Sequence, residues 1–478
     1  MAQQSLGVCL SELITDSKPV RAAFFRRTRR YGLRQFPCHV HGDGSISADT
    51  GYLDGVRGSA AALKTEAWDW RDTTTLPSKE DLIRALGITK KERVIKNSSH
   101  GEIWFGTVRC DRYKTHEVAI KFMPIHTREE ETHMSSRVAN SAYVDPFISW
   151  LGSQLVSKGQ STAFAQLYGT FLCRGYVRST SDDDDEGADR SPPLVAMVSE
   201  LLGEKIDTAI EECLPVKGQI RWQRLIAIVL QVMMALSQAH AMTFVHNDAH
   251  MGNFLVATRC HHAPMYVNVN GRYLMIPMQD RVVLMDFGRS TLAALDCENA
   301  TKCTSRRGGV DFAQPRLHSS EVADKFAEWQ VDNPGADVTH FAAMLVLCQS
   351  RKNMLVREAS RKDAPPEARA LVRLIRSALQ CNEDGIDMFY KYMQCNAEEL
   401  KDSAGHGFQK TRCGKDLIHD LREKKTKCRG ILPMDFLSDL ELTAPFLTSS
   451  QAVPLTENIY FPVPPCVVDD NASSRIKK

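Results

Sequence analysis

The chain has 478 residues, of which 43% are hydrophobic and 25% are charged, and its formal net charge is +2. This is the composition of an ordinary globular protein, long enough for about three domains or for one large two-lobed domain with extensions. The small net charge gives no reason to expect a specific nucleic-acid partner. The longest nearly apolar run, 225–236, falls short of the ~20 residues that span a bilayer, so we expect no membrane span.

The N-terminus and the cysteines predict an intracellular protein. No signal-peptide layout is present, and Glu12 and Asp16 disfavour a transit peptide. The 14 cysteines include no CxxC pair, which is typical of reduced thiols and not of a disulfide framework. We therefore expect a cytoplasmic or nuclear location, while the oligomeric state stays open.

Three segments lack the periodicity of regular structure. Residues 1–85 are predicted to form an N-terminal extension, and their basic run RRTRR, Arg26–Arg30, is more typical of a solvated face than of an import signal. The segment 179–193 is acidic and ends in prolines, which predicts a mobile loop between two strands. Four prolines predict an irregular C-terminal tail over 446–478.

Residues 86–203 have the pattern of strands. The runs RVIKNSS, GEIWFGTVRC, HEVAIKFM, FAQLYGTF and LVAMVSEL are short, rich in β-branched or aromatic residues, and bounded by turn residues. From 204 to 445 the chain becomes helical, and RWQRLIAIVLQVMMALSQAHA is apolar almost all round, as in a helix at the centre of a large lobe. The predicted fold class is α+β, with a small β-rich N-lobe followed by a larger α-helical C-lobe.

Polar residues interrupt the apolar segments at three places. Lys121 lies inside HEVAIKFM, where an ammonium group is costly unless it reaches an anion or solvent. HNDAHMGN places Asp248 and Asn253 between the long helix and the apolar FLV. RVVLMDFG ends an apolar strand with Asp286. The intervening hairpin signal, Asn270-Gly271, predicts that the chain returns and makes Asn253 and Asp286 neighbours.

One lysine, two aspartates and one asparagine suit phosphoryl transfer, which needs neutralised phosphate charge, oxygen ligands for Mg²⁺ and a base for the acceptor hydroxyl. VAIK, H-x-D-x-x-x-x-N and DFG occur in this order, so residues 90–350 resemble the eukaryotic-type protein kinases. The resemblance implies a bilobal fold that binds ATP and Mg²⁺. It places Lys121 on the α/β phosphates, Asp286 and Asn253 on the metal, and Asp248 on the acceptor hydroxyl.

The resemblance implies further nucleotide contacts. In GEIWFGTV, Gly101 would end a glycine-rich loop and Ile103 would cover the nucleotide together with Ala119 of VAIK. MVSELLGEKID would be the hinge that receives adenine, with Glu200 and Leu202 in the contact positions.

The acid that pairs with Lys121 is expected on the next helix, where REEETHMSSRV offers three glutamates, Glu129 to Glu131. Glu131 is preferred because Met134 then falls on the apolar face, and Glu130 comes second. GADVTHFAAMLVL would be a buried helix whose Asp337 braces the backbone of the catalytic loop. Lys121→Met and Asp286→Ala are both expected to abolish transfer and leave the fold largely intact.

Several features depart from the kinase pattern. The glycine-rich loop has few glycines, Asn247 stands where an arginine is usual before Asp248, and no APE tripeptide follows Gly288. These features are more similar to haspin-like kinases and to kinases of large DNA viruses, so an infected host cell is one expected setting. We predict an ATP-dependent serine/threonine kinase with a protein substrate.

Two other classes of function stay open. HNDAHMGN is similar to the loop of aminoglycoside- and choline-type small-molecule kinases, which is the first alternative, and a lipid- or quinone-related ATPase is more remote. A pseudokinase scaffold is the second alternative. It is disfavoured because Lys121, Asp248 and Asp286 are all present.

Overall fold

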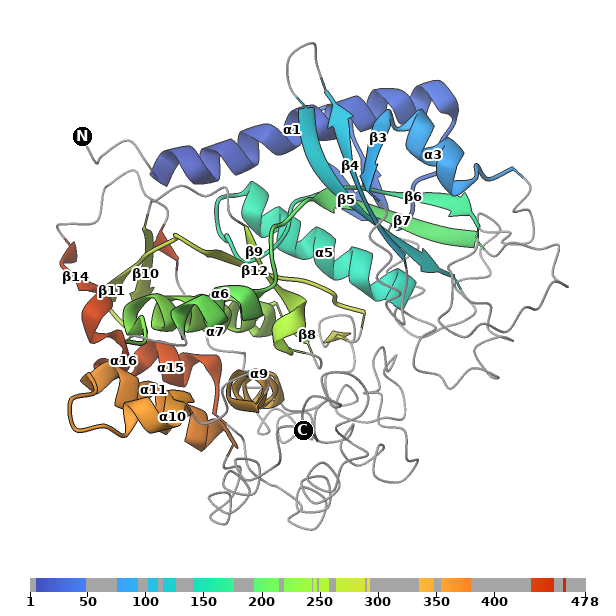
Figure 1. The fold of residues 1–478 in the computed structure, drawn as a ribbon. Coiled ribbons are helices and arrows are strands. Elements are labelled where there is room, and N and C mark those ends of the chain that lie inside the picture. The colour runs from blue at the N-terminus through green and yellow to red at the C-terminus, as the bar shows by residue number, and fades with distance from the viewer. Residues whose placement is uncertain are drawn as a thin grey trace, which may run out of the picture. The chain divides into compact units, whose positions relative to one another are not determined.

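The computed structural model contains both helices and antiparallel strands, as the predicted α+β class requires (Figure 1). The chain divides into two compact units. The first, called the sheet unit, comprises Leu10–Leu202 and Asp286–Ala313. The second, called the helical unit, comprises Met1–Cys9, Gly203–Met285 and Gln314–Lys478. The structure describes residues 6–48, 75–92, 102–110, 115–125, 141–175, 193–214, 219–242, 244–246, 249–257, 264–288, 290–292, 335–347, 354–379, 431–450 and 459–460.

An antiparallel sheet with the strand order β3-β4-β5-β7-β6 forms the centre of the sheet unit. Four predicted strands are confirmed as β4 to β7, whereas the run RVIKNSS lies outside the described residues and β3 directly precedes it. The acidic segment lies between β6 and β7, as predicted. The strands are β3 (Ile88–Glu92), β4 (Glu102–Arg109), β5 (Thr115–Pro124), β6 (Leu167–Arg174) and β7 (Pro193–Glu200).

Burial along β4 separates the two faces of this sheet. Glu102 and Trp104 are buried, whereas the alternating Ile103 and Phe105 are half-buried. Successive side chains of a strand point to opposite faces, so one face is closed over a core and the other is more open at β4. β6 and β7 are buried except at their last residues, Arg174 and Glu200, which is typical of strands covered on both faces.

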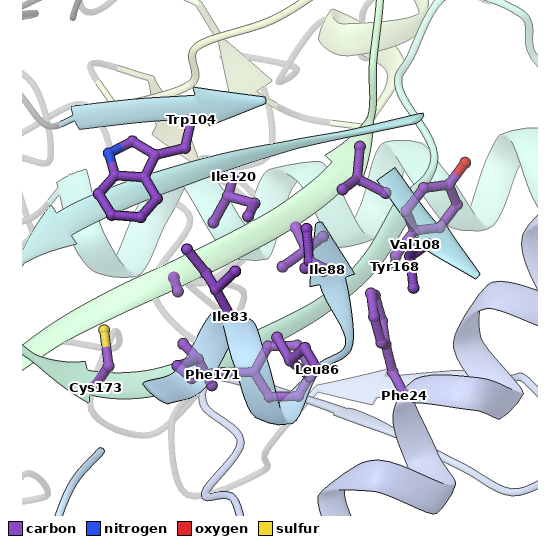
Figure 2. Packing of buried hydrophobic residues seen from close by; sticks show 14 of the residues in the cluster. Phe24, Ile83, Leu86, Ile88, Trp104, Val108, Ile120, Tyr168, Phe171 and Cys173 are labelled. Carbon is purple, nitrogen blue, oxygen red and sulfur yellow. The ribbon is translucent and has the colours of Figure 1, made fainter. Parts of the chain in front are cut away.

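Helices cover both faces of the sheet (Figure 1). The long helix α1 (Leu6–Tyr31) and the short helix α3 (Lys79–Ala85) lie on the closed face, and α5 (Ser141–Ser157) lies on the other. Figure 2 shows the core under α1 and α3, to which α1 contributes Phe24, α3 contributes Ile83, and the sheet contributes Trp104, Ile120 and Phe171. All five side chains are at most 7% exposed.

Much of the predicted N-terminal extension packs on the sheet. Val20, Ala23 and Phe24 of α1 are buried at the i, i+3, i+4 spacing of a helix face, a short signal that the low overall periodicity of residues 1–85 obscures. In the basic run, Arg26, Arg29 and Arg30 are exposed, which confirms a largely solvated face. Arg27 differs, because its guanidinium donates to the carbonyl oxygens of Leu86 (2.6 Å) and Arg109 (2.8 Å).

The helical unit is built around α7 (Trp222–Ala241), which confirms the predicted central helix. Gln231, the polar residue that interrupts its apolar run, accepts a hydrogen bond from the Val282 backbone N–H at 3.0 Å. The other elements are α6 (Ile206–Cys213), β8 (Phe244–Val245), η2 (Met251–Asn253), β9 (Phe254–Ala257), β10 (Met265–Val269), β11 (Arg272–Ile276), β12 (Arg281–Leu284), α9 (Gly335–Leu347), α10 (Met354–Ala359), α11 (Pro366–Leu379), α15 (Pro433–Ser438), α16 (Leu440–Thr443), η6 (Ala444–Phe446), β14 (Leu447–Thr448) and β15 (Ile459–Tyr460).

The predicted hairpin after Asn253 is confirmed. β10 and β11 pair antiparallel, and both turn residues have positive φ, +52° at Asn270 and +81° at Gly271, as the twist of a two-residue hairpin requires. The predicted irregular tail contributes two short strands to this sheet, whose order is β14-β11-β10-β15. The two edges of the hairpin carry unpaired backbone N–H and C=O groups, and the two short tail strands hydrogen-bond to these groups. Their own sequence does not predict strands of this length.

Among the described residues, α7 is also the one helix whose length and composition would allow it to cross a membrane. Of its apolar window, 83% is buried within the protein. The core helix of a folded domain passes the same test, so this feature is weak evidence for a membrane span.

Candidate active site

Lys121 lies on β5, the third strand of the sheet along the chain. The register pairs it with Ile103 of β4 on one side and with Met197 of β7 on the other. Because it alternates with Ile120 and Phe122, both buried in the closed core, its side chain is directed to the opposite face. This is the face that α5 covers.

Two carboxylates hold the Lys121 ammonium. Its Nζ donates to Oδ2 of Asp145 at 2.5 Å and to Oδ1 of Asp286 at 2.7 Å. Burial alone lowers the pKa of a lysine, but the charges and hydrogen bonds of the two carboxylates outweigh it and raise the pKa of Lys121 above its usual range. The lysine is therefore a fixed cation at neutral pH.

Asp145 is the residue of this cluster that sequence reasoning missed. It lies on α5 and is fully buried. Its Oδ1 accepts hydrogen bonds from the Ser149 hydroxyl (3.3 Å) and from the Phe287 backbone N–H (3.1 Å). The signal was a single acid in the apolar context VDPFI. Glu131, the predicted partner of Lys121, lies outside the described residues with Glu129 and Glu130, so that assignment stays a prediction.

Asp286 adopts an unusual backbone conformation. Its φ is +62°, in the left-handed region that few residues other than glycine adopt, and such strain is common at functional sites. Its side chain is 34% exposed, so it is the open member of the cluster. The next residue, Phe287, is buried and its ring lies 6.3 Å from that of Phe164.

The Phe164 ring in turn packs closely against α5. A Cβ atom at Gly152 would lie 2.6 Å from Cγ of Phe164, so only glycine allows this approach. Glycine weakens a helix interior by roughly 1 kcal/mol relative to alanine. The close contact with Phe164 explains why α5 carries one.

A second buried cluster lies in the helical unit. Oδ2 of Asp337, on α9, accepts from the His246 backbone N–H at 2.8 Å and lies 3.0 Å from Nε2 of His240. Burial alone would raise the pKa of Asp337, but the hydrogen bond and charge of His240, followed by His246, lower it below the usual value. The prediction that Asp337 braces the backbone just before Asp248 is confirmed; Asp248 itself lies outside the described residues.

His246 and Asn253 join this loop to the end of β12. Nε2 of His246 lies 2.9 Å from the Met285 carbonyl oxygen, and the Asn253 carbonyl accepts from the Met285 N–H at 2.9 Å. Asn253 is buried at the end of η2, a turn capped by His250, whose Nδ1 accepts from the Gly252 N–H at 3.0 Å. The predicted return of the chain therefore brings Asn253 to the residue that precedes Asp286.

The other predicted contact residues fall as follows. Ile103 and Ala119 share the Lys121 face of the sheet. The Glu200 carboxylate accepts from the Gln166 N–H at 3.1 Å, and Leu202 is buried. Gly101 lies outside the described residues. The roles of these residues toward a nucleotide stay predictions.

The predicted metal ligands belong to different units, Asp286 to the sheet unit and Asn253 to the helical unit. Carboxylate and amide oxygens are the ligand types that Mg²⁺ accepts, so the chemistry of this pair fits that ion. Within the described ranges, no cluster of three or more His, Cys, Asp or Glu side chains is arranged to hold a metal.

Comparison with known proteins finds matches among solved structures only. No protein-family model matches the chain, and no curated protein matches it. Among solved structures, the BubR1 kinase domain is a weak structural neighbour, with 14% sequence identity and a TM-score of 0.27. The match covers 42% of this chain and 47% of that one, so it spans about half of the neighbour's length.

Proposed function

We propose that this protein is an ATP-dependent phosphotransferase of the protein-kinase type, acting on serine or threonine hydroxyls of a protein substrate. The observation that carries the proposal is Lys121 held between Asp145 and Asp286. In protein kinases a lysine on the third strand pairs with an acid of a helix, and the aspartate of DFG binds Mg²⁺. Lys121 lies on the third strand, Asp145 on a helix and Asp286 in DFG.

The contacts of Asp286 support this assignment. One carboxylate oxygen of Asp286 accepts a hydrogen bond from Lys121, and the Asp286 side chain is one-third exposed. The carboxylate can therefore exchange its contact with the lysine for a contact with a bound cation. Lys121 keeps Asp145 as its partner in that exchange, and its ammonium becomes available to phosphate oxygens. Mg²⁺, held by Asp286 and Asn253, would neutralise phosphate charge.

The proposed reaction exchanges one P–O bond for another. The acceptor oxygen forms a bond to the γ-phosphorus as the bond between that phosphorus and the β–γ bridging oxygen breaks, and ADP leaves. Asp248 orients the hydroxyl and takes its proton. The proposal requires Asp248 and Asn253 to act on the nucleotide that Lys121 binds, which is the requirement that mutation of Asp248 tests.

A kinase assay with γ-labelled ATP and Mg²⁺ tests the proposal, with mixed protein substrates as acceptors. We expect label on protein, and a loss of at least about a hundredfold in Asp286→Asn and in Asp248→Asn. Asp363→Asn is the matched control, because Asp363 is 75% exposed and contacts only the exposed Arg361 among the described residues. No label on any acceptor, or full activity in Asp286→Asn, would overturn the proposal.

One observation favours small-molecule acceptors as a second candidate. His250, the second histidine of H-x-D-x-H-x-G-N, caps the turn that ends at Asn253, so it has a structural role in the loop that this motif defines. The same assay therefore includes a panel of aminoglycosides, choline and related alcohols. Label on these compounds alone, lost in Asp248→Asn, would select the small-molecule class over the protein class.

A further inference from the structure

Arg21 on α1 is a buried cation whose hydrogen-bond acceptors are all neutral groups. Its side chain is almost fully enclosed, and burial lowers its pKa to about 10, which still leaves it charged at neutral pH. Each of its three nitrogens donates hydrogen bonds. The acceptors are the carbonyl oxygens of Leu167 (2.9 Å) and Gly44 (3.5 Å), the hydroxyls of Ser153 (2.9 Å) and Ser157 (3.3 Å), and Oε1 of Gln166 (2.6 Å).

Such an arrangement is a poor source of stability. Taking a charge out of water costs several kcal/mol, and an apolar side chain of similar volume is often as stable in its place. A planar guanidinium, however, directs its donors along fixed lines, so it determines how the elements that supply the acceptors are placed.

The acceptors on α5 belong to a polar ridge. Asp145, Ser149, Ser153 and Ser157 recur every fourth residue, so they follow one another along the same side of the helix. At one end of this ridge, Asp145 holds Lys121 and the Phe287 N–H. At the other end, Ser153 and Ser157 hold Arg21. The ends are about 18 Å apart, given the rise of 1.5 Å per residue.

A second connection runs from Arg21 through Gln166. Gln166 and Glu200 exchange two hydrogen bonds, from the Glu200 N–H to the Gln166 carbonyl (2.9 Å) and from the Gln166 N–H to the Glu200 carboxylate (3.1 Å). Glu200 ends β7, the strand that pairs with β5 next to Lys121. The N-terminal helix is thus bonded both to the helix that carries Asp145 and to the end of the strand beside Lys121.

We propose that Arg21 is a positioning residue for the phosphotransfer site: it clamps α5 so that Asp145 stays against Lys121. This inference rests on the proposed function. It gives α1 a role in positioning the site, although the low periodicity of residues 1–85 predicts only an N-terminal extension. Loss of the clamp should let α5 shift and should weaken the hold of Asp145 on Lys121, with the first effect on nucleotide binding and transfer.

Arg21→Met tests the clamp, with Arg27→Met as a matched control. Arg27 lies on the same helix and also donates to two carbonyl oxygens, but those belong to Leu86 and Arg109 and not to α5. After correction for the folded fraction, we expect kcat/KM for ATP to fall about tenfold to a hundredfold in Arg21→Met. We expect kcat/KM in Arg27→Met to stay within about twofold of the wild type, because neither of its acceptors belongs to α5.

Hydrogen exchange of residues 141–157 is a readout that does not depend on activity. Exchange in this helix should be faster in Arg21→Met than in Arg27→Met at equal global stability. If Arg21→Met does not fold, Ser153→Ala/Ser157→Ala replaces it, because that pair removes two acceptors from α5 and little volume. In this double variant we expect kcat/KM for ATP to fall and exchange of α5 to become faster, both by less than in Arg21→Met.

The outcomes separate this inference from the proposed function. If the wild type transfers no phosphate while α5 loosens in the clamp variants, the proposed function fails and the catalytic role of the clamp fails with it. If the wild type is active but the clamp variants match Arg27→Met in kcat/KM and in α5 exchange, the clamp alone is overturned. Slower transfer with unchanged KM and unchanged α5 exchange would also contradict it, because the clamp acts through the position of α5.

Discussion

Two buried carboxylates, Asp145 in the sheet unit and Asp337 in the helical unit, are built into clusters that differ in exposure. Asp145 shares the Lys121 ammonium with Asp286, whose side chain is 34% exposed. Asp337 and its partner His240 are 0% and 1% exposed. A cluster with an open member can exchange a partner for a ligand. A closed cluster can only hold its own chain in place. Mutations at the open end of the Asp145 cluster should therefore lower mainly activity, whereas mutations in the Asp337 cluster should lower stability as well.

The largest effect is expected for Lys121→Met. The change leaves Asp145 buried without its cation, and breaking a buried ion pair costs about 3–5 kcal/mol. We therefore expect a loss of stability as well as of transfer, contrary to the sequence-based expectation that the fold stays largely intact. Asp286→Ala, at the open end, should abolish transfer with a much smaller loss of stability. Urea unfolding of both variants measures the difference.

A double variant sharpens that result. Lys121→Met/Asp145→Asn removes both charges, so it should recover part of the free energy of unfolding lost in Lys121→Met and none of the activity. The coupling between the two sites is obtained from the four proteins of the mutant cycle. A double variant less stable than Lys121→Met would mean that Asp145 is not held as an ion-pair partner.

Next in size is Asp337→Ala. It leaves the His246 N–H and the His240 ring buried without their acceptor, and we expect the free energy of unfolding to fall by about 2–3 kcal/mol. Transfer should fall too, because His246 lies two residues before Asp248. Asp337→Asn keeps an acceptor oxygen and should lose less of both. If Asp337→Ala lowered activity without any change in urea midpoint, the cluster would not be the closed brace described here.

Gly152→Ala adds volume beside Phe164 and changes none of the charges of the Lys121 cluster. The added methyl group would meet the Phe164 ring, which contacts Phe287, and overpacking of this kind costs about 1–3 kcal/mol. Gly271→Ala is the control, because a methyl group there meets open space and only the positive φ opposes it. If Gly152→Ala were as stable as the wild type in thermal unfolding and kept full transfer, Phe164 would be able to move aside freely.

The smallest effect concerns acid stability. The folded-state pKa of Asp337 is lowered, so the unfolded state binds its proton first as pH falls. The stabilisation from this carboxylate is complete above its unfolded pKa, about 3.9, and disappears as pH falls through the lower folded value. Between pH 5 and about pH 3, the urea midpoint should therefore fall more steeply in the wild type than in Asp337→Asn. Parallel slopes would contradict a lowered pKa at this position.

Local pattern was sufficient for several features. Four strands of the sheet, the central helix α7 and the Asn270-Gly271 hairpin follow from periodicity and turn chemistry, which act over a few residues. The brace by Asp337 was predicted from the resemblance, since the motif order places its helix after the catalytic loop. The packing of α1 was missed, because its apolar face is only a few residues long.

The sequence by itself determined which chemical groups are present: a lysine in a strand, a polar loop after a buried helix, and an aspartate after an apolar strand. Only the tertiary structure decided that Asp145 and Asp286 meet Lys121, because they lie 24 and 165 positions away along the chain. Three consecutive glutamates stood nearer to Lys121 in the sequence than Asp145. Contacts over such separations depend on how α5 packs on the sheet, and α5 is in turn bonded to Arg21, 132 residues before Ser153, which no local pattern records.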